Sequence, residues 1–147
     1  MTAPTYLISG VQTRAYKILR LHVYEVLSKH DLTPTCWSML GCIVEAHNGI
    51  RLAEVAANLG VKAPLITMLA NDLTGRGLIK RVPHHSDKRA KLLVMMPAGK
   101  KLVKTVEQAL YDHLNQLLQG VSNQDMAAYH KVLSAIIANH ETQISQS

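Results

Sequence analysis

The sequence has few aromatic residues, few cysteines and no long apolar run. Among its 147 residues there is no Phe and one Trp, so Leu, Ile, Val, Ala and Met must supply most of any core. The two cysteines, Cys36 and Cys42, lie six positions apart on a predicted helix, a separation that turns them onto different faces. An internal disulfide is therefore not expected, and a reducing, cytoplasmic location is the simplest interpretation.

Other absences exclude whole classes of function. No apolar run approaches the roughly eighteen residues that a membrane span needs, and no basic start followed by an apolar segment predicts a secretory signal. The chain has no Gly-rich phosphate loop, no G-x-S-x-G and no supported pair of carboxylates, so no enzyme is expected. Its eight histidines are scattered, without H-x-x-x-H or Cys-x-x-Cys, so neither a metal site nor a cofactor is predicted.

The most informative stretch runs from Val61 to Met96. Its first part predicts a helix, because Ile66, Leu69, Ala70 and Leu73 recur at the spacing of one helical face. Pro64 falls in the first turn, where a missing N–H costs little, and Gly77 is placed to cap the end. The opposite face mixes polar and apolar side chains that suit contact with a partner surface: Lys62, Leu65, Thr67, Met68 and Asn71.

A basic hairpin is predicted after this helix. Residues 78–83 and 91–96 alternate as two strands, and the loop between them contains Asp87, Lys88 and Arg89. From Thr74 to Lys104 there are nine Lys and Arg against one acid, a net charge of +8 in a chain whose total is +6. The positive charge is thus a local patch, which is typical of a nucleic-acid-binding surface.

Helices are predicted on both sides of this stretch. Residues 52–60 form a compact amphipathic helix ending at Gly60, and the short turn to the next helix matches helix-turn-helix chemistry. Thr33 and Pro34 open a helix before it, and residues 11–29 have helical spacing, whereas residues 1–10 are expected to be loosely held. After the hairpin, one helix is predicted from Pro97 to Gly120 and a last one from Ser122, with broad apolar faces that favour a two-fold dimer.

Several of these segments together resemble the MarR family of bacterial regulators. The most specific are the D-x-R of the loop, from Asp87 to Arg89, and the L-x-x-x-G-L-I-x-R segment over residues 73–81; residues 52–61 and 97–100 agree as well. The resemblance implies one mainly α domain over residues 1–147 with a small β-wing. In it, residues 33–96 form a winged helix-turn-helix, and helices 11–29 and 97–143 form the interface of a homodimer.

The resemblance also implies how the chain would bind a near-palindromic DNA operator. Residues 62–76 would be the recognition helix, Arg89 the wing arginine that enters the minor groove, and Asp87 the acid that orients it. The family often has a basic residue in the middle of this helix, where this chain has Met68, so bidentate base reading by Arg is not expected there. The residues expected to contact DNA are Lys62, Pro64, Leu65, Thr67, Met68, Asn71, Arg76, Arg81, Asp87, Lys88, Arg89 and Lys91.

The expected function is sequence-specific regulation of transcription by a repressor that a small molecule or an oxidant releases from DNA. Family likeness places a ligand pocket between the dimer helices and the winged part, with Tyr16, Arg20, His30, Cys36, Trp37 and Cys42 as candidates. Cys36 lies near a helix N-terminus that could lower its pKa, although an inert buried thiol is the commoner case.

Three alternatives remain open. They are a non-specific architectural DNA-binding protein, a winged helix that binds only protein, and a metal-responsive regulator. For the last, only His84 and His85 are adjacent, and neighbouring loop residues are expected to point apart.

Overall fold

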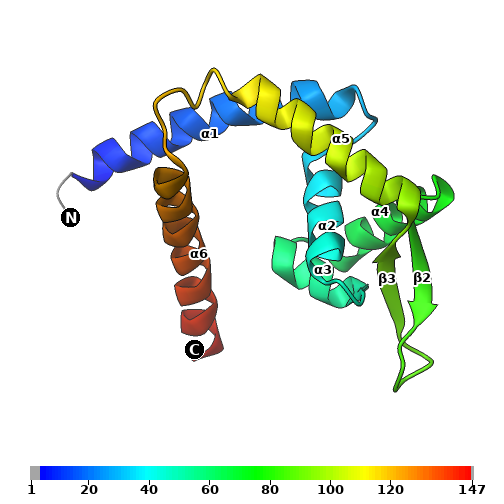
Figure 1. Ribbon diagram of the computed structural model, residues 1–147. Coiled ribbons are helices and arrows are strands. Elements are labelled where there is room, and N and C mark those ends of the chain that lie inside the picture. Colours follow the sequence, from blue (N-terminus) through cyan, green and yellow to red (C-terminus); the bar gives the residue numbers. More distant parts are fainter. Residues whose placement is uncertain (1–3, 147) are drawn as a thin grey trace. The chain divides into compact units, whose positions relative to one another are not determined.

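The computed structural model describes residues 4–146, which form six helices and one three-stranded antiparallel sheet (Figure 1). The chain divides into two compact units, the first ending at Leu114 and the second beginning at Asn115. The first unit contains α1 (Thr5–Ser28), α2 (Pro34–Glu45), β1 (Ile50–Arg51), α3 (Leu52–Leu59), α4 (Ala63–Gly75), β2 (Ile79–Pro83), β3 (Lys91–Met95) and α5 (Pro97–Leu114). The second contains α6 (Asn123–Ser145).

The core of the first unit is aliphatic, as the absence of Phe requires. It collects one face each of α2, α3 and α4, the sheet, the C-terminal end of α1 and the inner face of α5. The largest side chains that are fully enclosed are Leu27, Met39, Leu40, Ile66, Leu73, Ile79, Leu93, Val55 and Val106. Every buried residue is apolar, and no buried polar side chain lacks a hydrogen-bond partner among residues 4–146.

The helix-turn-helix is formed by α3 and α4. Gly60 ends α3 in the left-handed conformation, with φ of +62°, and the chain then bends by 119° into α4. A bend of this size across a short turn is characteristic of the motif. Gly77 also adopts a positive φ, +70°, and the Leu78 N–H donates to the Leu73 carbonyl at 3.0 Å, which closes the end of α4. The predicted ends of both helices are confirmed.

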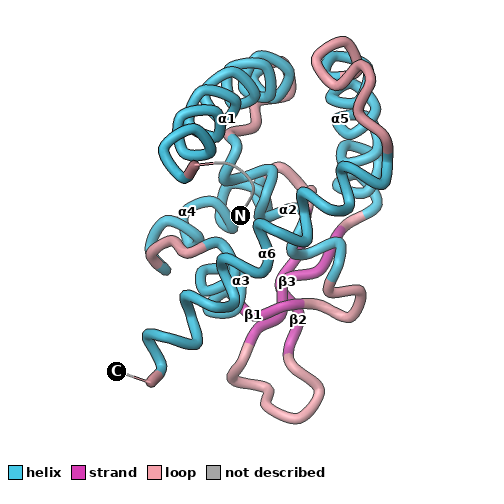
Figure 2. The backbone as a smooth tube through the Cα atoms, turned by 90° about the vertical axis from the view of Figure 1, so that its left-hand side faces the viewer, coloured by secondary structure: helices cyan, strands magenta, loops and turns pink. Residues whose placement is uncertain are grey.

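The wing is the hairpin of β2 and β3, and both predicted strands are confirmed. They pair antiparallel, with Arg81 opposite Leu93 and Pro83 opposite Lys91. The third strand, β1, pairs with the edge of β3 that faces away from β2. It was not predicted, because two residues are too few to show an alternating pattern in the sequence. The hairpin extends past α2, α3 and α4, and its loop lies at the tip (Figures 1 and 2).

Two helix boundaries were predicted wrongly. α1 begins at Thr5 rather than near Val11, because Pro4 occupies the N-cap and nothing after it interrupts the helix. α5 ends at Leu114 rather than at Gly120, and residues 115–120 form turns. Leu117 is 43% exposed there, so extending the helix through it would have gained little from burial.

The predicted N-cap of α2 is confirmed, since the Thr33 hydroxyl accepts a hydrogen bond from the Cys36 N–H at 3.1 Å.

The second unit is a single capped helix. Ser122 and Asp125 form the predicted capping box, in which the Ser122 hydroxyl accepts from the Asp125 N–H at 3.1 Å and the Asp125 carboxylate accepts from the Ser122 N–H at 2.9 Å. Hydrogen bonds from Ser122 lower the pKa of the Asp125 carboxyl. No residue of α6 is buried. Its exposed apolar residues are Met126, Tyr129, Val132, Ile136, Ile137 and Ile144.

No single helix among residues 4–146 is long and apolar enough to cross a membrane, and α3 and α4 would meet that test only as one sharply bent pair.

Candidate functional site

The outer face of α4 is exposed along its length. Its inner face buries Ile66, Ala70 and Leu73, which leaves the predicted contact residues on the solvent side. Two of these are apolar, since Met68 is 59% and Leu65 is 37% exposed. Leu65 and Met68 are three positions apart and so share one side of the helix, where they form a small apolar patch that suits contact with another surface. The hydroxyl of Thr67 donates to the Ala63 carbonyl one turn back, which fixes its side chain on this face.

A hydrogen bond joins this face to the wing. Nη2 of Arg81 on β2 donates to the carboxamide oxygen of Asn71 on α4 at 2.8 Å, and both side chains are exposed. The carboxamide NH₂ of Asn71 and the remaining N–H groups of Arg81 stay available to a partner. The bond therefore makes one polar surface of the helix and the strand.

The loop at the tip of the wing is held by short-range hydrogen bonds. The carboxylate of Asp87 accepts from the Arg89 backbone N–H at 3.0 Å, and the Asp87 carbonyl accepts from the Ala90 N–H at 3.0 Å. The His84 N–H donates to the Ala90 carbonyl at 2.9 Å and closes the loop. Asp87 thus holds the backbone of Arg89, while the Arg89 guanidinium has no hydrogen bond or ion pair with any described residue.

The two histidines at the start of this loop do not point apart, as the sequence suggested. The rings of His84 and His85 stack, with centroids 4.3 Å apart and planes 26° from parallel. Nδ1 of His84 is also 3.0 Å from the Ser86 hydroxyl, so the ring is engaged in ordering the loop. The two side chains do not point to opposite faces, as they would in a strand, because β2 ends at Pro83 and the chain bends after it.

Arg76 is directed differently from the other predicted contact residues. Its guanidinium donates to the Asp31 carbonyl at 2.8 Å and to the His30 carbonyl at 3.1 Å, and it lies 3.5 Å from the Asp72 carboxylate. These bonds tie the end of α4 to the turn between α1 and α2. Much of the donor capacity of Arg76 is therefore used within the fold, and less remains for a phosphate.

Five other cations on α4 and the wing have no such partners. Within residues 4–146 the side chains of Lys62, Lys80, Lys88, Arg89 and Lys91 are exposed and make no ion pair or hydrogen bond. They flank the outer face of α4 and follow the wing to its tip. Unpaired Lys and Arg side chains can neutralise the phosphates of DNA and release its condensed counterions, so the arrangement suits a phosphate backbone.

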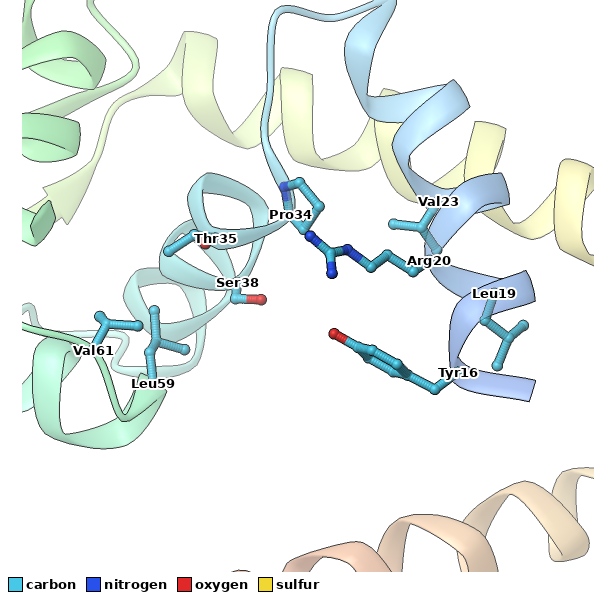
Figure 3. Close-up of a pocket in the computed structure, with 9 residues that line it drawn as sticks. All are labelled: Tyr16, Leu19, Arg20, Val23, Pro34, Thr35, Ser38, Leu59 and Val61. Carbon is cyan, nitrogen blue, oxygen red and sulfur yellow. The ribbon is translucent and has the colours of Figure 1, made fainter. Parts of the chain in front are cut away.

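A cavity of about 380 Å³ lies between α1, α2 and the turn that follows α3 (Figure 3). The hydroxyl of Tyr16 and the guanidinium of Arg20 extend from α1 toward α2, where the Ser38 hydroxyl faces them (Figure 3). Leu59 and Val61, which flank Gly60 in the turn of the motif, form the far wall. The other lining residues are Leu19, Val23, Pro34 and Thr35. The cavity is mostly apolar, with one cation and three hydroxyl groups.

The structure separates the predicted ligand residues into two groups. Tyr16 and Arg20 line the cavity, whereas His30, Trp37 and the cysteines do not. The His30 carbonyl accepts from Arg76, and Trp37 packs against the core. Thr35, Ser38 and Leu59 were missed, because their positions on α2 and α3 meet α1 only in the folded chain.

The two cysteines are free thiols, and Cys36 is buried in the core. Burial raises the pKa of the Cys36 thiol and also that of Cys42, so Cys36 is the buried, inert kind of thiol rather than one activated by the start of α2. For Cys36 the nearby Arg76 charge and the hydrogen bond at Thr33 oppose this effect but are smaller. A thiol with a raised pKa is a poor nucleophile at neutral pH.

Comparison with known proteins agrees with this geometry. The model of the MarR family matches residues 30–90, which span α2 to the tip of the wing. CouR from Rhodococcus jostii RHA1, solved with p-coumaroyl-CoA bound, is 23% identical with a TM-score of 0.79, over 92% of this chain and 95% of CouR. A MarR-family transcriptional regulator from Rhodococcus sp. RHA1 is 21% identical with a TM-score of 0.77, over 92% of this chain and 96% of that protein.

A mutant MarR from E. coli, solved in complex with operator DNA, has the same fold. It is 21% identical with a TM-score of 0.70, over 88% of this chain and 92% of MarR. These likenesses extend the fold well beyond the residues that the family model matches. The helix-turn-helix and most of the wing thus match the model of the MarR family over residues 30–90, and most of the chain has the winged-helix fold of these solved structures.

Proposed function

We propose that this protein is a sequence-specific DNA-binding regulator of transcription that acts as a repressor. The main support for this proposal is the hydrogen bond between Asn71 and Arg81. It joins the exposed face of α4 to the wing, whose other cations are unpaired. A face of this kind, with hydrogen-bonding and apolar groups beside positive charge, fits a DNA groove and its phosphates.

In this proposal α4 enters the major groove. Thr67 and the NH₂ of Asn71 reach base edges, and Leu65 and Met68 contact thymine methyl groups. The wing follows the backbone into the neighbouring minor groove, where Arg89 reads groove width and Lys88 meets phosphates. Arg81 and Lys91 hold further phosphates, while Arg76 contributes through the donors left over from its bonds to the α1–α2 turn.

We also infer a homodimer. The N-terminal half of α1 exposes Tyr6, Leu7, Ile8 and Val11, and α6 exposes an apolar stripe with no buried residue. Apolar surface on two separate helices, close to the two ends of the chain, is best explained by burial against a second copy. A two-fold dimer would place two copies of α4 on half-sites about ten base pairs apart, in a near-palindromic operator.

The cavity supports control by a small molecule. Its volume lies within the range of about 300–1,000 Å³ that is usual for ligand sites. Arg20 and the Tyr16 hydroxyl suit an anionic group, and Val23, Leu59 and Val61 suit an aromatic or aliphatic body. Because Leu59 and Val61 flank the turn between α3 and α4, a ligand there would favour one setting of that turn and so change the affinity for DNA. Release by an oxidant has less support, since Cys36 is buried with a raised pKa.

Selection of bound sequences from a random pool of double-stranded DNA tests the first proposal. The expected result is an enriched near-palindrome, bound at least about a thousandfold more tightly than unrelated DNA at the same salt concentration. If no motif is enriched and unrelated DNA competes equally, the chain is a non-specific architectural protein. If no DNA binds at any salt concentration, the wing serves a protein partner.

The effector proposal is tested with aromatic carboxylates and their thioesters, including 4-hydroxybenzoate and p-coumaroyl-CoA, in titrations of the DNA complex. A ligand of this class should release the selected DNA from the wild type, and Arg20→Ala should require a higher concentration while binding DNA normally. Release of equal potency from Arg20→Ala, or no release by any member of the panel, would contradict this use of the cavity.

A further inference from the structure

A second cluster of polar side chains joins α1 to α5, and none of its residues lines the cavity or belongs to the proposed DNA-facing surface. His22 and Glu25 are three residues apart on α1 and so share a face, and His113 reaches them from α5. Nδ1 of His22 lies 3.0 Å from Nε2 of His113, and the same Nε2 lies 3.5 Å from the Glu25 carboxylate. The three ligand atoms all fall within 4.8 Å of one another.

Two of these distances, those from His113 to His22 and to Glu25, match the spacing of neighbouring ligands of one small metal ion. Zinc bonds to nitrogen and oxygen of about 2.0–2.1 Å place neighbouring ligands of a tetrahedral site about 3.3 Å apart. The separations of 3.0 and 3.5 Å lie on either side of that value. Little movement of the side chains would therefore be needed to bring all three atoms onto one ion.

The chemistry of the donors points the same way. Two imidazole nitrogens at 3.0 Å can share one proton, and a divalent cation in its place accepts a lone pair from each ring. Glu25 adds a negative charge, which lowers the net charge of the loaded site. Two imidazoles with one carboxylate are a ligand set that zinc and neighbouring transition metals occupy in proteins.

The surroundings leave the site open on one side. His22 and His113 are half-buried, so their rings are oriented by the packing of α1 against α5, whereas Glu25 is exposed. The other carboxylate oxygen of Glu25 lies 3.9 Å from the Lys29 ammonium, which holds the carboxylate on this side of α1. A fourth position facing solvent would be filled by water.

We propose that His22, Glu25 and His113 bind one divalent transition metal ion, with Zn²⁺ as the reference ion and water as the fourth ligand. The ion would join α1 to α5 at a point where the two helices already touch. The sequence did not predict this site, because its histidines are 91 positions apart and come together only through helix packing. The proposal does not depend on DNA binding or on the effector cavity.

Zinc binding to the full-length protein, freed of metal with EDTA, is measured by competition with a chromophoric chelator. The expected result is one Zn²⁺ per chain, with each of His22→Gln, Glu25→Gln and His113→Gln lowering the affinity at least about tenfold. His140→Gln is the matched control, because it removes an imidazole from α6 outside the cluster, and it should bind zinc as the wild type does. Circular dichroism verifies that each variant is folded.

Two further measurements distinguish this site from zinc bound elsewhere on the protein. Co²⁺ in place of Zn²⁺ should give the visible bands of a tetrahedral nitrogen and oxygen site, without the thiolate charge-transfer band that Cys36 or Cys42 would produce. Zn²⁺ should raise the Tm of the wild type but not that of the variant lacking all three ligands. Equal zinc affinity in that variant, a thiolate band, or no saturable binding would each overturn the proposal.

Discussion

The carboxamide oxygen of Asn71 accepts a hydrogen bond of 2.8 Å from the guanidinium of Arg81, which joins the exposed face of α4 to strand β2. The bond sets the position of a cation relative to the helix that is proposed to read bases. It therefore predicts that the two residues contribute to DNA binding as a pair.

Arg81→Ala should weaken binding to the selected DNA and reduce the slope of log affinity against log salt by about 0.9, the value for one lost phosphate contact. Asn71→Ala should weaken binding and also relax sequence preference. Because Asn71 positions Arg81, the double variant should lose less than the sum of the single losses. Fluorescence anisotropy at several salt concentrations measures both effects. Strict additivity would mean that the bond does not persist in the complex.

Arg89→Ala should cost about 1–3 kcal/mol of DNA-binding free energy, because the wing tip loses its unpaired guanidinium. Lys131→Ala removes the same charge from α6 and should have a much smaller effect. The comparison separates a contact at the wing from a general loss of positive charge. Equal affinities of the two variants in the same titration would remove Arg89 from the proposed interface.

Arg76→Lys should destabilise the fold by about 1–2 kcal/mol while keeping the charge. An ammonium cannot donate to the Asp31 and His30 carbonyls with the geometry of the guanidinium fork. Chemical denaturation measures the change, and Lys80→Ala, on an exposed side chain without partners, should be nearly neutral. Unchanged stability together with weakened DNA binding would assign Arg76 to phosphate contact instead.

Gly99→Ala should destabilise the protein by about 1–3 kcal/mol. A Cβ at this position in the first turn of α5 would collide with the Leu78 carbonyl, which already accepts from the Met96 N–H at 2.9 Å, and would lie 2.7 Å from the Met95 methyl group. Gly41→Ala in α2 is the matched control, because a Cβ there meets nothing within 4 Å. It should leave the Tm unchanged or raise it slightly.

A drop in stability for both glycine variants, or for neither, would contradict the packing of α5 against the end of α4.

Cys36 should react slowly with iodoacetamide in the folded protein. Its raised pKa keeps the thiol protonated at neutral pH, and its side chain is only 3% exposed. Because the pKa of Cys36 is higher in the folded state, the folded protein binds the thiol proton more tightly than the unfolded protein does. The contribution of Cys36 to stability is therefore complete below the ordinary thiol pKa of 9.0 and is lost as the pH rises above it.

Mass spectrometry after timed alkylation measures the reactivity of Cys36, with urea-unfolded protein as the reference. Cys36→Ala should remove the part of the alkaline loss of stability that belongs to this thiol. Rapid alkylation of Cys36, or loss of DNA affinity on peroxide treatment that Cys36→Ala prevents, would restore the oxidant-release hypothesis.

The sequence by itself determined the local structure of the winged part. Gly60 and Gly77 fix the C-terminal ends of α3 and α4, Thr33 caps α2, and the spacing of Ile66, Ala70 and Leu73 fixes which face of α4 is buried. These features depend on short-range chemistry, namely backbone conformation, capping and periodicity, and a single segment contains all the information required.

Tertiary structure alone decided which distant groups meet. Arg76 belongs to the basic patch, yet its guanidinium donates to carbonyls 45 and 46 positions away in the sequence. Cys36 lies at the start of a helix, yet burial raises its pKa. His22 and His113, and likewise Tyr16 and Ser38, come together only when helices pack. Such contacts depend on where whole elements lie relative to one another, which no local pattern of residues encodes.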